Sequence, residues 1–320
     1  MISLNKHVLI SRLNKLSCFE NNPSVAVAVS GGPDSMALVY IVNNWVKNNN
    51  GKLSALIFDH GLRENSNEEA NEVKIFLKEL KIKSHIIKAK KNNLIKRNMA
   101  QARINRFNGL INFCLKNNIL HLFLGHHFDD NLETYLMRKI NGSNLEGLGS
   151  MNILSCMERI QIIRPLIETN KRSIINFNKK NKIKFINDPS NEDYNYTRVQ
   201  IRNFLQNKNY KKLAKLDFLK IKNQIPEYKK MIWELFIKNI TKINNNKVEI
   251  NFNRFIKSDD LVIEKHILIL LKFFSNKNYQ TKSQKIKILI DIMKKPEFKF
   301  FNLSGINIKK YEDILLFSQK

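Results

Sequence analysis

The stretch that most constrains the fold is residues 25–38, VAVAVSGGPDSMAL, where an alternating apolar run stops at two glycines and resumes with helical spacing. The chain has only 10 glycines in 320 residues, so a pair at one junction calls for a reason. Glycine permits a positive φ or a close approach of the backbone to another group. A strand that ends in such a loop and leads into a helix N-terminus forms an anion site. The junction therefore predicts a phosphate-binding loop over residues 30–35.

Strand and helix patterns alternate through the first 200 residues, which favours a parallel sheet with right-handed crossovers and with ligands at the carboxyl ends of its strands. The polar segments 30–35, 59–63 and 125–130 each follow an expected strand, so we expect them to meet at one edge of the sheet. Apolar runs predict strands over 25–29, 53–58, 85–88, 119–127, 160–163 and 184–186. Helical spacing predicts an amphipathic N-terminal helix and helices over 35–47, 68–80, 99–116, 130–140 and 171–181.

The composition changes after about residue 205, where lysine and isoleucine dominate and segments such as MIWELFIKNI have helical spacing. The end of the chain has strand-like runs around a turn at Ser304 and Gly305. We therefore expect an α/β protein: a Rossmann-like, parallel-sheet domain over 1–207 and a second, mostly helical domain with a small β element over 208–320.

The composition is that of a globular protein, with 43% hydrophobic and 26% charged residues. No apolar run reaches the ~20 residues of a membrane-spanning helix, and the N-terminus is too polar for a secretory signal. Cys18, Cys114 and Cys156 are far apart and form no C-x-x-C pair, so we expect neither disulfides nor a zinc site. A cytoplasmic location and no membrane partner follow as expectations.

The formal net charge of +27 suggests a nucleic-acid partner, because clustered cations displace counterions from phosphate backbones. The alternative is that the lysine excess reflects a biased overall composition. The arginines are more informative than the lysines about a nucleic-acid partner, since arginine is suited to bidentate phosphate contacts. Nine of the 12 arginines lie between Arg97 and Arg202, in the same region as the polar motifs.

The loop SGGPDS lacks the lysine of the G-x-x-x-x-G-K-[ST] phosphate loop, yet it offers backbone N–H groups, two hydroxyls and a helix N-terminus. Asp34 is unexpected in a pure anion site, and a carboxylate beside phosphates suits Mg²⁺. The simpler alternative is a tight turn with Asp34 as the helix N-cap.

A second motif, GHHFDDNLET over 125–134, places many ionisable groups where a buried strand opens into a helix. Glu133 lies three residues beyond Asp130, on the same helical face. One alternative is that an aspartate caps the helix while the histidines bond locally. Another is a binuclear metal site of a phosphohydrolase, made by Asp34, Asp59, His60, His126, His127 and Asp130.

Six segments in one order resemble the PP-loop ATP pyrophosphatase domain of tRNA(Ile)-lysidine synthetases, an adenine nucleotide alpha hydrolase-like fold. They are SGGPDS, DHGLRENS, ARINRF, GHHFDDNLET, RPL and NDPSNEDYNYTRVQIR, and they span about 24–205. This chain has Asn131 where the family often has glutamine and Phe107 where it often has tyrosine. We also expect it to lack the extra C-terminal domain of the longer members.

The resemblance implies an ATP-dependent ligase that adenylates the wobble cytidine of a CAU-anticodon isoleucine tRNA. The side-chain amine of L-lysine then displaces AMP and forms lysidine. The resemblance places ATP on Ser30, Gly31, Gly32, Pro33, Asp34, Ser35 and His60. It places Mg²⁺ on Asp34 and Asp130, and catalysis on Asp34, His127, Asp130, Glu133 and Arg106.

The arginines Arg103, Arg198 and Arg202 are expected to hold the tRNA, with Arg198 and Arg202 either gripping the anticodon loop or closing the active site. Arg103 and Arg106 share one helical face, whose simpler role is to face solvent. Two other functions stay open here. One is a PP-loop tRNA thiolase, which commonly needs paired cysteines, and the other is a basic tRNA-binding protein with an inactive loop. A homodimer is one option for the assembly.

Overall fold

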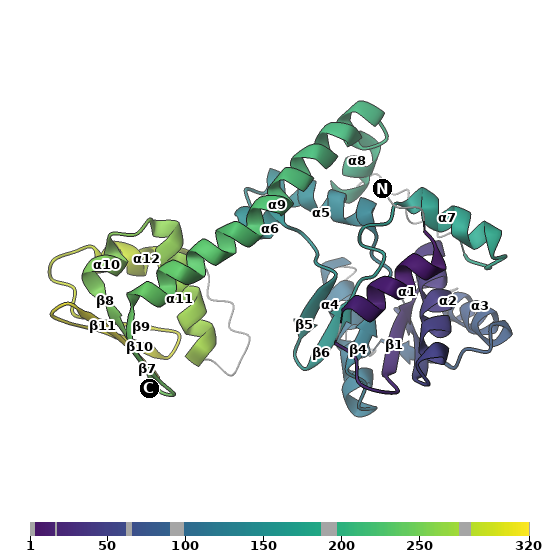
Figure 1. Ribbon diagram of the computed structural model, residues 1–320, viewed down its shortest axis with the longest axis horizontal. Coiled ribbons are helices and arrows are strands. Elements are labelled where there is room, and N and C mark those ends of the chain that lie inside the picture. Colours follow the sequence, from purple (N-terminus) through teal and green to yellow (C-terminus); the bar gives the residue numbers. More distant parts are fainter. Residues whose placement is uncertain are drawn as a thin grey trace. The chain divides into compact units, whose positions relative to one another are not determined.

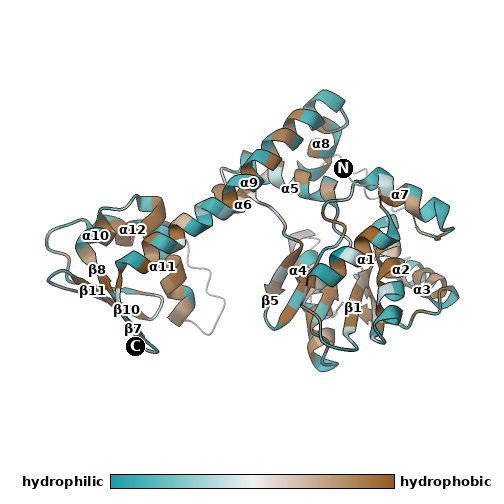
Figure 2. Ribbon diagram, in the orientation of Figure 1, coloured by the Kyte–Doolittle hydropathy of each residue, from teal (hydrophilic) through white to brown (hydrophobic). Residues whose placement is uncertain are grey.

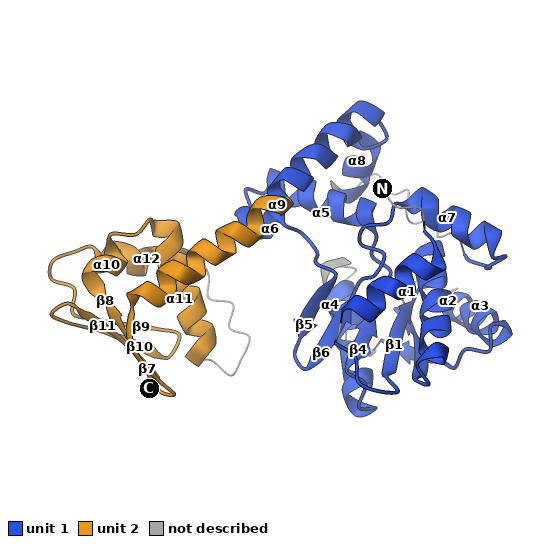
Figure 3. Ribbon diagram, viewed as in Figure 1, with its two compact units in different colours: residues 1–221 blue, residues 222–320 orange. Residues whose placement is uncertain are grey.

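The computed structural model describes residues 4–16, 18–61, 66–89, 99–186, 197–274 and 283–319. It divides into two compact units, Met1–Ile221 and Lys222–Lys320 (Figure 3). The division falls inside the long helix α9 (Lys208–Asn239). Parts of two motifs, residues 62–65 and 187–196, lie outside the described residues.

A six-stranded sheet in the order β3-β2-β1-β4-β6-β5 forms the centre of the first unit (Figure 1). All neighbouring strands are parallel except β5, which runs antiparallel to β6. Val27 of β1 is in register with Ala55 of β2 and Phe123 of β4, so these three strands end side by side. The strands are β1 (Ser24–Val29), β2 (Lys52–Asp59), β3 (Ser84–Lys88), β4 (His121–Phe123), β5 (Leu154–Met157) and β6 (Ile160–Ile163).

Helices cover both faces of this sheet, because the side chains of β1 alternate between two cores. Val25 and Val27 pack with α2 on one face, while Ala26 packs with α4 on the other. Hydrophobic residues are accordingly concentrated in β1 and α2 (Figure 2). The helices of the unit before α9 are α1 (Lys6–Lys15), α2 (Pro33–Asn48), α3 (Ser66–Glu79), α4 (Met99–Lys116), α5 (Phe128–Ile140), α6 (Leu145–Leu148), α7 (Lys171–Lys180) and α8 (Thr197–Phe204).

A separate small core joins α8 and the beginning of α9 to α5. Leu132 and Tyr135 of α5 pack against Ile201 of α8 and Phe218 of α9. The Tyr135 hydroxyl also donates to Asp217, at 2.6 Å. This core fixes α8 over the first turns of α5, where the second sequence motif lies.

The structure corrects two strand predictions and adds one strand. The expected strand over 119–127 is paired only at His121–Phe123, and from there the chain leaves the ladder towards α5. Residues 184–186 form no strand, because the Ile186 N–H bonds to the Gly31 carbonyl instead of to a sheet. The hairpin partner β5 was not predicted, since LSCM has no alternating pattern.

The second unit holds a five-stranded antiparallel sheet in the order β7-β8-β11-β10-β9, larger than the small β element expected. The predicted turn at Ser304 and Gly305 joins β9 to β10, with φ of 54° and 86°, the positive values that a type I′ hairpin turn requires. Its elements are β7 (Ile240–Asn244), β8 (Lys247–Asn251), α10 (Phe252–Ile256), α11 (Asp260–Phe274), α12 (Ser283–Met293), β9 (Phe300–Leu303), β10 (Ile306–Tyr311) and β11 (Ile314–Gln319). Among the described residues of the whole chain, no helix is long and apolar enough to cross a membrane.

Candidate active site

In the loop between β1 and α2, the side chains of the two serines lie within hydrogen-bond distance of each other. The Ser30 N–H donates to Ser35 Oγ at 3.1 Å, and that hydroxyl donates to the Gly32 carbonyl at 3.0 Å. Gly31 has a φ of +83°, and a Cβ there would lie 2.5 Å from Val73 Cγ2. Gly32 has an ordinary φ of −68° as N-cap. The fold thus requires a glycine at position 31, but it does not require one at position 32.

Segments far along the chain hold this loop in place. The Ile186 N–H bonds to the Gly31 carbonyl at 2.9 Å. The fully buried Asn178 of α7 donates to the Pro33 carbonyl at 2.8 Å. Gly125, after β4, lies so near the start of α2 that a Cβ would stand 3.2 Å from the Ser35 nitrogen. The loop is therefore a rigid, preformed element.

Asp34, in the first turn of α2, divides its two oxygens between different surroundings. Lys171 Nζ lies 2.6 Å from Oδ2. Oδ1 is buried without a hydrogen-bond partner among the described residues, and His127 Nε2 lies 3.7 Å from it. A buried carboxylate oxygen without a partner is costly, so Oδ1 is a candidate atom for binding a cation.

The second motif forms the first turns of α5, and His127 caps the helix. Its ring accepts from the Asp130 N–H at 3.3 Å, while Asp130 accepts from the His127 N–H at 3.1 Å. Asp129 instead accepts from the Lys171 N–H and from Lys211 of α9. The alternative in which an aspartate caps the helix is therefore wrong, because His127 is the cap, and its capping box brings Asp130 to the site.

Glu133 carries the most densely paired carboxylate of the site, with only 4% of its surface exposed. Arg198 Nε donates to its Oε2 at 2.7 Å and Arg202 Nε to its Oε1 at 2.8 Å. Arg198 also reaches Asp130 at 3.3 Å. The structure thus brings both arginines of α8 into the acidic cluster of α5, where each keeps further N–H groups for a ligand.

The charges of this cluster shift the pKa values of its acids downward. Burial alone would raise the pKa of Asp130, but His127 and Arg198 outweigh it and hold the pKa below its ordinary value. At Asp129, burial again acts to raise the pKa, but the hydrogen bond from Lys211 acts against it, and the pKa is lowered. Both aspartates are therefore anionic at neutral pH and suited to bind a cation.

A cationic group faces these carboxylates and includes residues that the sequence did not single out. Burial lowers the pKa of Arg106, and Arg103 and Arg198 lower it further. Burial also lowers the pKa of Arg164 to about 10, again with Arg103 contributing. Mutually repelling, partly desolvated arginines favour a bound anion. Arg164 and its RPL motif were noticed only through the resemblance.

His126 was predicted only as a ligand of the alternative binuclear metal site. Burial lowers the pKa of His126 to about 3, with Arg164 among the further causes, so the ring is neutral. Its Nδ1 is buried and has no hydrogen-bond partner among the described side chains and backbone groups. Nothing in the sequence separates His126 from His127, since the two adjacent histidines differ only in the direction their rings take from the backbone.

His60, Arg103 and Arg106 meet on the other side of the sheet edge. Burial lowers the pKa of His60 and the charge of Arg106 lowers it further, which places the two near each other. Both arginines lie beside the Phe107 ring, with guanidinium carbons 5.4 and 5.7 Å from its centroid. Phenylalanine in place of the family's tyrosine therefore still supplies a ring against the arginines.

The acidic residues fit Mg²⁺ better than a metal held by protein ligands alone. Across the described parts of the chain, no group of three or more histidine, cysteine or acidic side chains is arranged to hold a metal ion. Mg²⁺ needs only one or two carboxylates, because substrate phosphates and water complete its octahedron. Asp34 Oδ1 and the anionic Asp130 meet that need.

Comparison with known proteins agrees with the fold. The PP-loop domain family matches residues 5–209, so the chain is a PP-loop protein. A U34-tRNA thiolase from Methanococcus maripaludis, solved with its iron–sulfur cluster, has the same fold, with a TM-score of 0.54 at 19% identity over 66% of this chain and 78% of that one.

Relatives found by sequence similarity identify the family more specifically than the fold does. The tRNA(Ile)-lysidine synthase of Wolbachia pipientis wMel is 33% identical, over 97% of this chain and 73% of that protein. That of the Wolbachia of Brugia malayi is 31% identical, over 92% and 70%. That of Orientia tsutsugamushi is 37% identical over 61% of this chain, and the match spans 44% of its length. This chain belongs to the tRNA(Ile)-lysidine synthase family, whose members are C–N bond-forming ligases with an ATP-using domain.

Proposed function

We propose that this chain makes lysidine from the wobble cytidine of a CAU-anticodon isoleucine tRNA, using ATP and L-lysine. ATP first transfers its adenylate to the cytidine 2-carbonyl oxygen and releases pyrophosphate. The side-chain amine of lysine then attacks the activated carbon, and AMP leaves. The observation that carries the proposal is the buried Asp34 Oδ1, which lies 3.7 Å from His127 Nε2 and has no hydrogen-bond partner among the described residues.

The loop of residues 30–35 would bind the departing pyrophosphate. Its serines are already engaged with each other, so the backbone N–H groups and the N-terminus of α2 remain as the chief anion ligands. Gly32 leaves room for the phosphates at a position where the fold does not need glycine. Bound Mg²⁺ would neutralise charge on the leaving group, with Asp34 and Asp130 as its protein ligands.

The cationic group on the opposite side would bind the adenylate phosphate and the RNA near it. Arg106 is the residue proposed to stabilise the reacting phosphate, with His127 and His60 as further contacts. Arg103 would hold the tRNA backbone, because its charge is only partly offset by the distant Asp130. Preorganised donors of this kind act where charge develops during the reaction.

The lysine substrate would bind at Asp130 and Glu133. An ammonium group entering the site needs carboxylates for recognition, and must then lose a proton to attack. Glu133 is buried and already held by two arginines, so it is oriented for such a contact. Arg198 and Arg202 would close the site over the anticodon loop while they keep Glu133 in position.

The proposal is tested by incubating the protein with Mg²⁺-ATP, lysine and a CAU isoleucine tRNA transcript, followed by mass analysis of the anticodon fragment. We expect a gain of one lysyl group on the wobble cytidine that depends on both ATP and lysine. No gain, with ATP still cleaved to AMP and pyrophosphate, would keep the PP-loop chemistry but reject lysine or this tRNA as substrate. No cleavage of ATP at all would indicate an RNA-binding protein with an inactive loop.

A further inference from the structure

Among the described residues of the second unit, α11 and α12 pack against one face of the antiparallel sheet. The buried side chains Val248, Phe317, Ile308 and Leu303 pack with α11 and α12 in a single core. Strand pairing places Phe300 opposite Lys309, and Lys309 opposite Leu316, on the alternate face. That alternate face is not part of the core described for this unit.

Two aromatic rings are exposed there, which is unusual for the solvent side of an antiparallel sheet. Phe300, on the edge strand β9, is 53% exposed, and Tyr311, at the end of β10, is 54% exposed. Ile314, paired with Tyr311, is 39% exposed. A contiguous group of exposed apolar side chains marks an interaction site more often than a random surface does.

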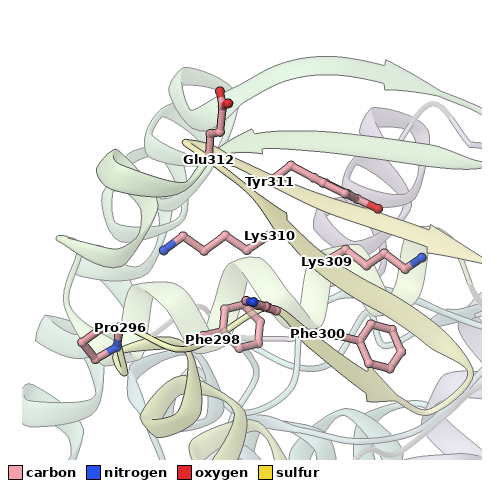
Figure 4. A pocket seen from close by; sticks show the side chains of 8 residues that line it. Pro296, Phe298, Phe300, Lys309, Lys310, Tyr311 and Glu312 are labelled. Carbon is pink, nitrogen blue, oxygen red and sulfur yellow. The ribbon is translucent and has the colours of Figure 1, made fainter.

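A lysine lies beside one of these rings. Lys309 Nζ lies 5.9 Å from the centre of the Phe300 ring. Figure 4 shows Phe300, Lys309 and Tyr311 extending to the same side of the β9–β10 hairpin, while Lys310 extends away from them. These residues line a shallow hollow of about 560 Å³, together with Pro296, Phe298, Lys299 and the single acidic residue Glu312.

We propose that this aromatic–lysine face, defined as Phe300, Tyr311, Lys299 and Lys309, binds unpaired bases of RNA. Flat, half-exposed rings suit base stacking, and lysines beside them suit the phosphates between stacked bases. The surface is shallow and cationic, which fits a polyanion with planar groups better than it fits an apolar peptide or helix. The inference rests on the proposed function only in naming the tRNA substrate as the RNA.

The test uses the full chain and measures affinity for three probes: the CAU isoleucine tRNA transcript, a single-stranded RNA 12-mer and the same 12-mer annealed to its complement. Phe300→Leu combined with Tyr311→Leu keeps apolar side chains but removes the rings. We expect tRNA and single-strand affinity to fall about fivefold or more, since stacking contributes about 1–3 kcal/mol per base. Binding of the duplex should stay unchanged.

Matched variants separate stacking from folding and from general charge. Phe300→Tyr with Tyr311→Phe keeps both rings and should bind as the unaltered chain does. Lys309→Gln should weaken all RNA binding, whereas Lys242→Gln, an exposed lysine on the opposite edge strand β7, should not. If the variant with both leucines unfolds at a lower temperature than the unaltered chain, the Phe300→Tyr/Tyr311→Phe variant and the two lysine variants still test the proposal.

The proposal is overturned if the leucine pair binds the single strand as tightly as the unaltered chain, or if it loses duplex binding equally. It is also overturned if Lys242→Gln weakens binding as much as Lys309→Gln. Lysidine formation is assayed in parallel on the unaltered chain. If the unaltered chain forms lysidine but the leucine pair binds RNA normally, only the proposal about this surface is rejected. If the leucine pair loses RNA affinity but the unaltered chain forms no lysidine, only the proposed function is rejected.

Discussion

Lys171 Nζ contacts Asp34 Oδ2 at 2.6 Å, so the carboxylate proposed to bind Mg²⁺ is already half neutralised by the protein. The same residue donates its backbone N–H to Asp129 at 2.8 Å. One residue at the start of α7 thereby joins the phosphate-type loop to the acidic turn of α5. The two motifs reach a fixed separation before any nucleotide arrives.

Asp34→Asn tests the role of this carboxylate while keeping its shape. We expect ATP–pyrophosphate exchange to fall by at least about a hundredfold, the usual scale for losing a group that stabilises developing charge. Affinity for the tRNA transcript should be unchanged. Glu168→Gln, on an exposed carboxylate paired with Arg12, is the matched control. Equal loss of tRNA binding and exchange in Asp34→Asn would show that Asp34 supports folding instead.

The two glycines of the loop should respond differently to alanine. Gly31→Ala forces a side chain into a positive φ and against Val73, so the unfolding free energy should fall by about 2–4 kcal/mol. Gly32→Ala meets nothing closer than Ser30 Oγ at 3.6 Å and should leave the melting temperature unchanged. ATP affinity, measured by calorimetry, should nevertheless fall in Gly32→Ala. Unchanged ATP affinity there would place the phosphates elsewhere.

Glu133→Gln removes the charge shared by Arg198 and Arg202. Breaking a buried ion pair costs about 3–5 kcal/mol, and because the two arginine side chains are 33% and 36% exposed the expected loss is smaller, about 1–3 kcal/mol. Activity is therefore compared below the lowered melting temperature. KM for lysine should rise while KM for ATP changes little. Glu158→Gln, in the exposed β5–β6 turn, serves as control, and a rise confined to KM for ATP would refute the assignment.

Arg198→Ala and Arg202→Ala should weaken tRNA binding more than ATP binding. Each lost phosphate contact should also lower the slope of log affinity against log salt by about one. Arg172→Ala, on the exposed side of α7, is expected to have little effect. Filter binding across a salt series measures both quantities. A larger effect on ATP than on tRNA would mean that these arginines face the nucleotide.

His266 makes the second unit sensitive to acid. It is fully buried in α11, and its Nε2 bonds to the Ile232 carbonyl at 3.0 Å. Burial lowers the pKa of His266, so below the ordinary histidine pKa of about 6.5 the unfolded chain takes up a proton that the folded unit resists. The unfolding free energy therefore decreases as the pH falls below that value, by at most about 1.4 kcal/mol per pH unit.

His266→Gln should keep the bond to Ile232 and flatten this acid dependence. Melting temperatures at pH 5, 6 and 7.5 measure the effect. His7→Gln, in the first helix, is the control for removing a histidine. An identical acid slope in the unaltered chain and in His266→Gln would exclude this residue as the cause.

The sequence predicts those features that follow from local pattern. The junction at residues 30–35, the strand before it and the helix after it are all encoded by neighbours in sequence, and each appears where expected. The meeting of the polar segments at one sheet edge follows from parallel strand order. The roles of Lys171 and Asn178 were not predictable, because each contacts residues more than a hundred positions away.

The wrong strand predictions have a related cause. Most of residues 119–127 are buried, and burial alone does not specify strand pairing. Past Phe123 the backbone bonds once more to β6, through the Leu124 N–H, and then the Phe128 N–H bonds to the Thr169 carbonyl. The departure from the ladder is what turns His127 and Asp130 towards Asp34.

The helix cap made by His127 also selects one tautomer of its ring. Because Nδ1 accepts the Asp130 N–H, the proton of the neutral imidazole is assigned by the hydrogen-bond network to Nε2. That nitrogen lies 3.7 Å from Asp34 Oδ1 and 3.5 Å from Asp130 Oδ2. With Nδ1 accepting, Nε2 offers a donor, and no lone pair, to the space between the two aspartates. It can hydrogen-bond an anionic oxygen that enters there, and it leaves metal coordination to the carboxylates.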